Sequence, residues 1–284
     1  MTTQTNLINV KQSIKYPELF VHKYHRKVFF KNLWHEDSRL VESRGRVYNS
    51  SGDVVINPFT KIFNYKENNT NLDRNEKCLV IEKINGFMAG VTWVPDVNDV
   101  VVSTTGSLDS DYGEMAKEMM PKVIEYVRTR KEPITYIFEI VHPNDPHIIP
   151  ENIGVYLIGM REVNNTTHYK TDKSKETRLD YIAKLMKAMR PVFYLSNFDE
   201  VLEEMKSCKH EGFMVYGESG KVLKLKSPYY LSSKALARKK DIMTLDKSRV
   251  DEEFYPLIDE IKDNDYFNNL SEQERLDFIR NYFN

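Results

Sequence analysis

The chain has 284 residues, and its 41 Lys and Arg against 42 Asp and Glu leave a formal net charge of −1 at pH 7. This balance excludes the overall basic field of a nucleic-acid coat protein, so any site for a polyanion has to be a local patch. Hydrophobic residues make up 40% and charged residues 29%, which is typical of globular proteins and excludes long disordered tracts.

The length of the apolar runs and the number of cysteines exclude further classes of protein. No apolar run approaches the ~20 residues of a membrane span, and the polar segment 1–9 lacks the hydrophobic stretch of a signal peptide. The two cysteines, Cys78 and Cys208, exclude a disulfide framework and a four-cysteine zinc site. We therefore expect a soluble protein of the reducing cytoplasm.

The first half of the chain predicts short strands followed by a helix. Turn signals interrupt β-forming runs throughout residues 40–102. These signals are Ser51-Gly52, Asn57-Pro58, Asn85-Gly86 and Pro95-Asp96. Residues 112–130 are expected to form one helix, because apolar side chains recur every four positions from Met115. The aromatic and β-branched run 134–141 predicts a further strand.

The second half predicts a strand, two helices and a hairpin. A strand at 154–160 precedes a helix over 175–189, and Asn197 with Glu200 predicts a capping box for the next helix. Strands at 211–216 and 221–226 are joined by a glycine-containing turn, a hairpin signal.

After residue 231 the chain is expected to be helical. Residues 234–240 are basic, and Ser271 with Glu274 predicts a capping box for the last helix. The pattern as a whole predicts an α+β domain followed by a small helical tail.

One segment delivers a single lysine into a tight turn, Glu82-Lys83-Ile84-Asn85-Gly86. Gly86 would let the backbone approach a ligand closely. Asn-Gly between two strands is also typical of a type I′ hairpin turn, with the lysine merely solvated beside it. The segment alone leaves both interpretations open.

Two carboxylates and two lysines stand at strand positions that a ligand could reach. Glu139 is carried by the strand 134–141, and Glu211 begins the next hairpin, although both also fit exposed strand ends. A period of two places Lys224 and Lys226 on one face of their strand and two leucines on the other. The two ammonium groups on such a face could bind a phosphate, or they could protect an edge strand from pairing with another strand.

In this order the segments resemble the motifs of the covalent nucleotidyltransferase superfamily, which contains ATP-dependent RNA and DNA ligases and mRNA capping enzymes. Lys83 to Gly86 resembles the first motif, Lys-x-Asp-Gly or Lys-x-Asn-Gly. Phe138-Glu139 resembles the third motif, residues 211–215 the fourth and residues 224–226 the fifth.

Within the superfamily, residues 40–231 are most similar to the phage T4 RNA ligase 1 family. Ser43-Arg44-Gly45-Arg46 resembles the Arg-Gly element before the nucleophile, and Lys61-Ile62-Phe63-Asn64 resembles the Lys-x-Phe-Asn segment that follows it. Lys226-Ser227-Pro228-Tyr229-Tyr230 resembles the Lys-Ser-x-x-Tyr ending. The tail beyond matches no domain of that family.

The resemblance implies a fold and an activity. The fold is a nucleotidyltransferase (adenylation) domain of antiparallel sheets flanked by helices over residues 1–231, with a short helical C-terminal region at 232–284. The activity is ATP-dependent RNA ligation. The implied substrate is RNA with a 5′-phosphate and a 3′-OH, the implied cofactors are ATP and Mg²⁺, and we expect a monomer. Occurrence of the family in bacteriophages implies RNA repair in the host cytoplasm.

The resemblance also implies the site residues. Lys83 would form the phosphoramide with AMP, while Lys224 and Lys226 would hold the α-phosphate. The residues implied to bind the nucleotide are Arg44, Lys61, Phe63, Gly86, Glu139 and Glu211. The two glutamates among them would bind the ribose hydroxyl and a hydrated metal ion, and which glutamate does which stays open.

Attack on ATP needs a neutral amine, and a lysine with an ordinary pKa of about 10.4 is neutral in only about one molecule in 10³ at pH 7. We therefore expect Lys224, Lys226 and Mg²⁺ to lower the pKa of Lys83.

Three alternatives remain at this point. The chain could be a ligase that prefers DNA or mixed RNA–DNA ends, or a capping guanylyltransferase that uses GTP. From a different class, it could be an inactive nucleic-acid-binding relative.

Overall fold

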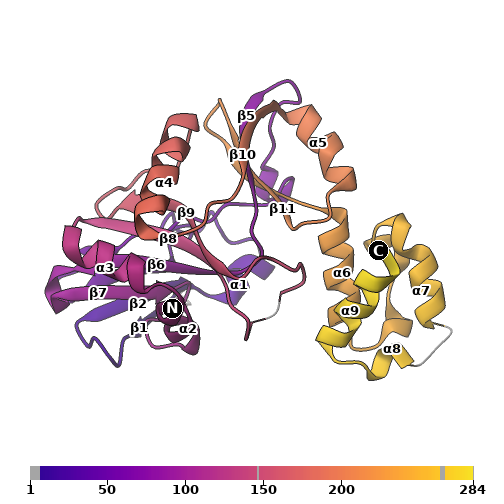
Figure 1. The fold of residues 1–284 in the computed structure, drawn as a ribbon, viewed down its shortest axis with the longest axis horizontal. Helices are drawn as coiled ribbons and strands as arrows, with labels where there is room; N and C mark the ends of the chain where they lie inside the picture. The colour runs from indigo at the N-terminus through magenta and orange to yellow at the C-terminus, as the bar shows by residue number, and fades with distance from the viewer. Residues whose placement is uncertain (1–6, 146, 263–265, 284) are drawn as a thin grey trace, which may run out of the picture.

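The computed structural model describes residues 7–145, 147–262 and 266–283. Residues 1–6, the start of the polar N-terminal segment, lie outside this part. Three four-stranded antiparallel sheets form the larger body, and a group of helices stands beside it (Figure 1). The predicted α+β class is confirmed.

The sheets are ordered β1-β2-β3-β4, β10-β5-β11-β12 and β7-β6-β8-β9. The strands are β1 Ile8–Gln12, β2 Leu19–Tyr24, β3 Arg44–Asn49, β4 Val54–Ile56, β5 Lys77–Glu82, β6 Phe87–Val94, β7 Asp99–Thr104, β8 Ile134–Val141, β9 Gly154–Glu162, β10 Phe193–Asn197, β11 Gly212–Gly217 and β12 Val222–Lys226. The helices are α1 Arg26–Phe30, α2 Asp111–Met119, α3 Pro121–Arg130, α4 Lys173–Met186, α5 Phe198–Ser207, α6 Pro228–Arg238, α7 Tyr255–Lys262, α8 Tyr266–Asn269 and α9 Glu272–Phe283.

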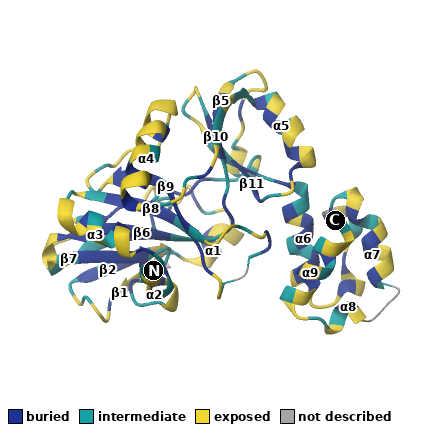
Figure 2. Ribbon diagram, viewed as in Figure 1, coloured by how far each residue is buried: buried dark blue, intermediate teal, exposed yellow. Residues whose placement is uncertain are grey.

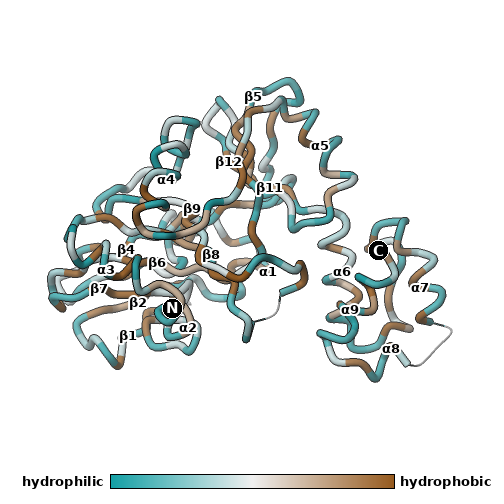
Figure 3. The backbone as a smooth tube through the Cα atoms, viewed as in Figure 1, coloured by the Kyte–Doolittle hydropathy of each residue, from teal (hydrophilic) through white to brown (hydrophobic). Residues whose placement is uncertain are grey.

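Each sheet buries its apolar side against a different partner. The sheet of β6 to β9 packs on α2, α3 and α4, and the sheet around β5 packs on α5. The central strands are mostly buried, while the outer faces of α4 and α5 are exposed (Figure 2). Hydrophobic residues follow the central strands and hydrophilic ones the peripheral loops (Figure 3).

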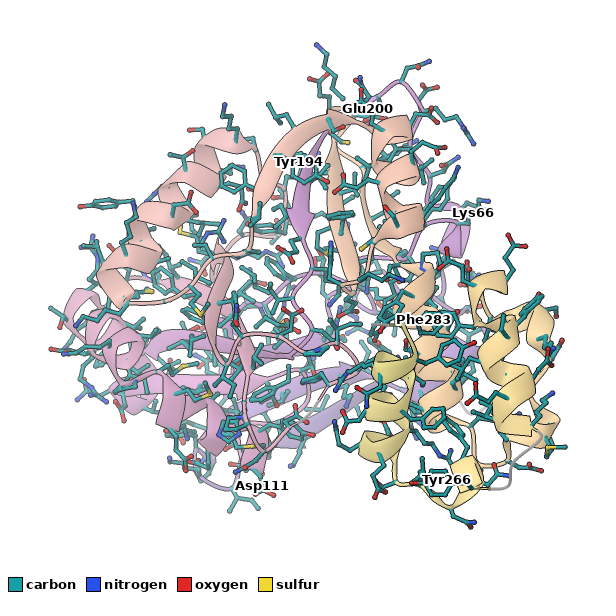
Figure 4. All side chains as sticks on the ribbon, turned by 45° about the vertical axis from the view of Figure 1, so that its right-hand side comes forward. Lys66, Asp111, Tyr194, Glu200, Tyr266 and Phe283 are labelled. Atoms are coloured by element: carbon teal, nitrogen blue, oxygen red, sulfur yellow. The ribbon has the colours of Figure 1, made fainter. Side chains whose placement is uncertain are left out.

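The C-terminal helices have a core of their own. Phe283, labelled in Figure 4, lies 4.5 Å from the ring of Phe254 and 6.0 Å from that of Tyr229. This core also buries Ile148 and Ile149 from the loop after β8, so it is tied to the sheets. Helix α6 crosses the predicted domain boundary at residue 231, and that boundary stays a prediction.

Several predicted elements differ in detail. Residues 112–130 form two helices, α2 and α3, because Pro121 lacks an N–H and starts a new helix. The helix predicted to reach residue 189 ends at Met186, where Lys187 takes a left-handed conformation. Strand β10 was not predicted, since its five residues show no alternation of burial.

Other predictions from local sequence signals are confirmed. The capping boxes at Asn197 and Ser271 form as predicted. Within the described residues, no helix combines the length and apolar character that crossing a membrane requires.

Candidate active site

A cavity of about 450 Å³ lies between the sheet of β5 and the sheet of β6. Seven of the nine predicted site residues line it: Arg44, Lys83, Gly86, Glu139, Glu211, Lys224 and Lys226. A larger cavity of about 820 Å³ lies at the other end of the β5 sheet and contains none of the nine.

Strand register explains why three motifs distant in sequence meet. Phe213 of β11 pairs with Glu82 of β5, and Gly212 pairs with Lys226 of β12. The backbone N–H of Lys83 donates to the Gly212 carbonyl at 2.9 Å. Lys83, Glu211 and Lys226 therefore lie side by side where three neighbouring strands end.

Lys83 is held by a carboxylate inside the cavity. Its side chain is 19% exposed, and its Nζ lies 2.8 Å from Glu211 Oε2. It also donates to the Ile84 carbonyl at 3.3 Å. The lysine therefore points into the cavity rather than into bulk solvent.

The pKa of Lys83 is shifted in the direction opposite to the one expected from sequence. Burial alone would lower it, but the attraction of Glu139 and Glu211 outweighs burial and raises the pKa above its ordinary value. Sequence reasoning counted the cations of the fifth motif and overlooked how close the two carboxylates come.

The Asn85-Gly86 pair does not form a type I′ turn. Neither residue has a positive φ, and the flanking strands β5 and β6 belong to different sheets. A Cβ on Gly86 would meet the Ile140 carbonyl oxygen at 2.3 Å, so the glycine is required by the close approach of β8. Its N–H donates to Glu139 Oε1 at 3.3 Å.

Asn85 connects the nucleophile segment to its surroundings and is 6% exposed. Its Nδ2 donates to Glu211 Oε2 at 2.7 Å, and its Oδ1 accepts from the N–H of Ile149 at 3.0 Å. Its own N–H donates to Glu151 Oε1 at 3.0 Å. Sequence analysis identified Asn85 as a motif position but missed these partners.

Glu211 is the centre of the charge arrangement. It is 3% exposed, and its Oε1 lies 3.2 Å from Lys226 Nζ. Burial raises its pKa, yet Lys83 and Lys226 together hold the pKa below the ordinary value. Both of its oxygens are therefore occupied by ammonium or amide donors.

Lys224 and Arg44 form no ion pair with a described residue, although Glu67 interacts with Lys224, and Glu139 with Arg44, over a longer distance. Burial, followed by the charge of Arg44, lowers the pKa of Lys224 to about 6. Gly45 has a φ of +89°, and a Cβ there would lie 2.7 Å from the Thr104 carbonyl, which explains the glycine beside Arg44. Two basic side chains that line a cavity and form no ion pair with a described residue suit the binding of an anion.

Glu139 retains capacity to accept further bonds. Apart from the Gly86 N–H on Oε1, no described residue donates a hydrogen bond to its carboxylate. Burial raises its pKa, which Lys83 partly offsets.

Lys61 and Phe63 do not line the cavity but lie directly behind it. Lys61 Nζ lies 5.0 Å from the Phe63 ring and 3.4 Å from Glu67 Oε1, and burial lowers its pKa. The carbonyl of Phe63 accepts from the backbone N–H of Lys224 at 2.9 Å. The two residues thus support the strand that carries Lys224.

Residues missed by sequence reasoning complete the lining. Tyr230 and Arg238 come from α6, and the ring of Tyr230 lies 4.8 Å from Lys226 Nζ. Glu82 also lines the cavity. Glu151 lies beside it, and burial raises its pKa to about 7. Glu82, Tyr230 and Arg238 belonged to segments that the sequence singled out, but none of them was predicted as a site residue, and Glu151 belonged to no such segment.

Residues 42–230 match the protein family described as RNA ligase. The chain belongs to this family. The predicted membership in the T4 RNA ligase 1 type of ligase is therefore confirmed. No curated protein matches the chain in sequence.

Solved structures show the same fold. An archaeal ATP-dependent RNA ligase shares 15% identity at a TM-score of 0.59, covering 96% of this chain and 73% of that one. A putative ATP-dependent DNA ligase from Aquifex aeolicus shares 12% identity at a TM-score of 0.57, with coverage of 96% and 73%. At these identities the likeness establishes the ligase nucleotidyltransferase fold of the RNA ligase chain.

Proposed function

We propose that this RNA ligase is ATP-dependent and that Lys83 is its nucleophile. The observation that carries the proposal is the grouping of Lys83, Lys226 and Glu211 with two basic side chains, Arg44 and Lys224, that form no ion pair with a described residue. One amine is held in place by a carboxylate. Arg44, and Lys224 once a bound anion has raised its pKa, are available to phosphate oxygens.

The reaction proceeds in three displacements at phosphorus. Lys83 Nζ loses a proton and attacks the α-phosphorus of ATP, forming a P–N bond as pyrophosphate leaves. A 5′-phosphate oxygen of RNA then attacks the same phosphorus, the P–N bond breaks, and a pyrophosphate-linked adenylate forms on the RNA. Finally a 3′-OH loses its proton and attacks the RNA 5′-phosphorus, which releases AMP.

The Lys83–Glu211 pair keeps the amine in place before the reaction. Since the pKa of Lys83 is raised, its Nζ carries a proton in the free protein. Glu211 Oε2, at 2.8 Å, is the atom placed to receive that proton when ATP arrives. Lys224 and Lys226 would then neutralise the α-phosphate oxygens.

The residues present also fit a divalent cation, which we propose is Mg²⁺. Glu139 has free oxygen capacity, whereas both oxygens of Glu211 are taken by nitrogen donors. No set of three or more potential metal ligands occurs among the described residues. One carboxylate together with substrate phosphates suits Mg²⁺, which would add positive charge at the phosphate oxygens when bound. We assign Glu139 to this role.

The proposed substrate is RNA with a 5′-phosphate and a 3′-OH end. We propose that the enzyme acts as a monomer. We place the enzyme in the cytoplasm, or in the host cytoplasm if the gene is viral, where ATP and RNA ends occur together.

Covalent labelling tests the proposal. We expect α-labelled ATP with Mg²⁺ to leave acid-stable label on the chain and Lys83→Ala to abolish it. Lys226→Ala should also abolish it, whereas Lys122→Ala, an exposed lysine on α3, serves as the matched control. Label from GTP alone would point to capping, and label from neither nucleotide would overturn the proposal. Sealing assays with RNA and DNA strands then decide the polymer.

A further inference from the structure

Helix α1 keeps two aromatic side chains at the surface. Phe29 and Phe30 are 49% and 76% exposed, and no other phenylalanine of the described residues is exposed. Their rings lie edge to face at 5.5 Å. Val28 beside them is fully buried, so the helix is anchored and presents both rings outward. Exposed rings forgo the free energy of burial, which indicates a contact surface.

The segment of the sequence that carries the two rings is cationic. Between Glu18 and Glu36 the sequence contains no acidic residue. The same stretch contains the cations Lys23, Arg26, Lys27 and Lys31. None of Arg26, Lys27 and Lys31 forms an ion pair with a residue that the structure describes. The local charge therefore complements a polyanion, although the whole chain is nearly neutral.

The rings lie close to the active-site cavity. Lys61 Nζ is 5.7 Å from the Phe29 ring and 5.0 Å from the Phe63 ring. The Phe63 carbonyl in turn accepts from the backbone of Lys224, which lines the cavity. Only Lys61 and Phe63 therefore lie between the Phe29 ring and Lys224, the lysine that we propose binds phosphate.

We propose that Arg26, Lys27, Phe29, Phe30 and Lys31, the α1 surface, bind single-stranded RNA next to the end that is joined. Unpaired bases stack on the two rings, and the cations hold the neighbouring phosphates. The proposal rests on the RNA ligase function above and adds the surface that holds the strand beside the joined end. Stacking on phenylalanine is tolerant of sequence, so the surface selects strandedness rather than base.

Fluorescence anisotropy with a labelled, 5′-phosphorylated oligouridylate tests this directly. Phe30→Ala should weaken binding about 5- to 100-fold, the range expected for loss of one stacked base. Phe30→Trp should retain binding, because the larger ring still stacks. Tyr181→Ala is the matched control, since Tyr181 is 64% exposed on α4 and far from this surface in sequence. Thermal unfolding of each variant confirms folding.

The contribution of the cations to RNA binding is measured separately, from its salt dependence. Arg26→Ala combined with Lys31→Ala should reduce the slope of log binding constant against log salt by about 1.4, or about 0.7 for each lost phosphate contact. Blunt duplex RNA of equal length should bind with no dependence on Phe30, because its bases are already stacked.

Three results would overturn the proposal that the α1 surface binds single-stranded RNA. The first is an unchanged affinity of Phe30→Ala for the oligouridylate. The second is an equal loss of affinity for duplex RNA in the same variant. Light scattering that shows Phe30→Ala dissociating a dimer with RNA affinity unchanged would instead identify an interface between copies. RNA binding is also measured without ATP, so it does not depend on label uptake. Failure of label uptake would therefore overturn the proposed function alone. RNA binding that does not depend on Phe30 would overturn the proposed α1 surface alone.

Discussion

Lys224 has a pKa at which its charge state responds to a ligand bound beside it. Its pKa of about 6 in the free protein means that its amine is largely neutral at pH 8. A phosphate beside it favours the ammonium form and raises the pKa again. Anion binding at this position is therefore coupled to proton uptake.

We predict that a non-hydrolysable ATP analogue takes up close to one proton from solvent on binding at pH 8. Calorimetry in buffers of different ionisation enthalpy measures the number. Lys224→Met should lower it by about one, and at pH 5, below the pKa, the uptake assigned to Lys224 should vanish. Equal uptake by Lys224→Met and the unmodified chain would contradict this assignment.

The same shift affects stability. An unfolded lysine has a pKa of about 10.4, so between about pH 6 and pH 10 the unfolded chain binds a proton that folded Lys224 lacks. The contribution of Lys224 to the free energy of unfolding therefore increases with pH across this window.

At the scale of elements, the β11–β12 hairpin sets the distance between Glu211 and Lys226. Gly212 has a φ of +126°, and a Cβ there would lie 2.0 Å from the Leu225 carbonyl oxygen. A side chain at this position would have to separate the two strands where the charged residues emerge.

We predict that Gly212→Ala lowers the free energy of unfolding by about 3 kcal/mol or more, because both the backbone conformation and the close contact are lost. Gly52→Ala is the matched control: its φ is +88°, but nothing lies within 4 Å of its Cβ position. It should cost only about 1–2 kcal/mol. Urea unfolding measures both, and equal costs would show that the contact with Leu225 contributes nothing.

At the scale of the whole molecule, the C-terminal helices reach the nucleophile through one loop. Arg280 of α9 donates to the carbonyls of His147 at 3.2 Å and Ile148 at 2.9 Å. The next residue, Ile149, donates to Asn85, which in turn donates to Glu211. The helical tail is thus part of the support of the active site.

We predict that Arg280→Ala slows label uptake from ATP about 5- to 30-fold, the equivalent of about 1–2 kcal/mol for two lost hydrogen bonds. The KM for ATP should change little, since Arg280 does not line the cavity. Arg280→Lys should restore part of the rate. Asn281→Ala, an exposed neighbour on α9, is the control. A rate equal to that of the unmodified chain would show that the tail does not act on Lys83.

Much of the local structure was predictable because short-range periodicity decides it. Strand β8 has the predicted bounds, and Lys224 and Lys226 share a face of β12 opposite buried Leu223 and Leu225. The two capping boxes depend only on residues three positions apart. Pro121 shows where periodicity misled, since apolar spacing continued through a residue that starts a new helix.

The sequence by itself determined the RNA ligase family, the α+β class and seven of the residues that line the cavity, because these follow from the order of the motifs and from the alternation of apolar and polar residues along the chain. Only the tertiary structure decided that Lys83 carries a raised pKa, that Asn85 bridges it to the tail, and that Phe29 and Phe30 stand exposed beside the site. These properties depend on distances between residues more than 100 positions apart, such as Lys83 and Glu211, which are 128 positions apart. Such distances are set by strand register and helix packing, and no local pattern encodes them.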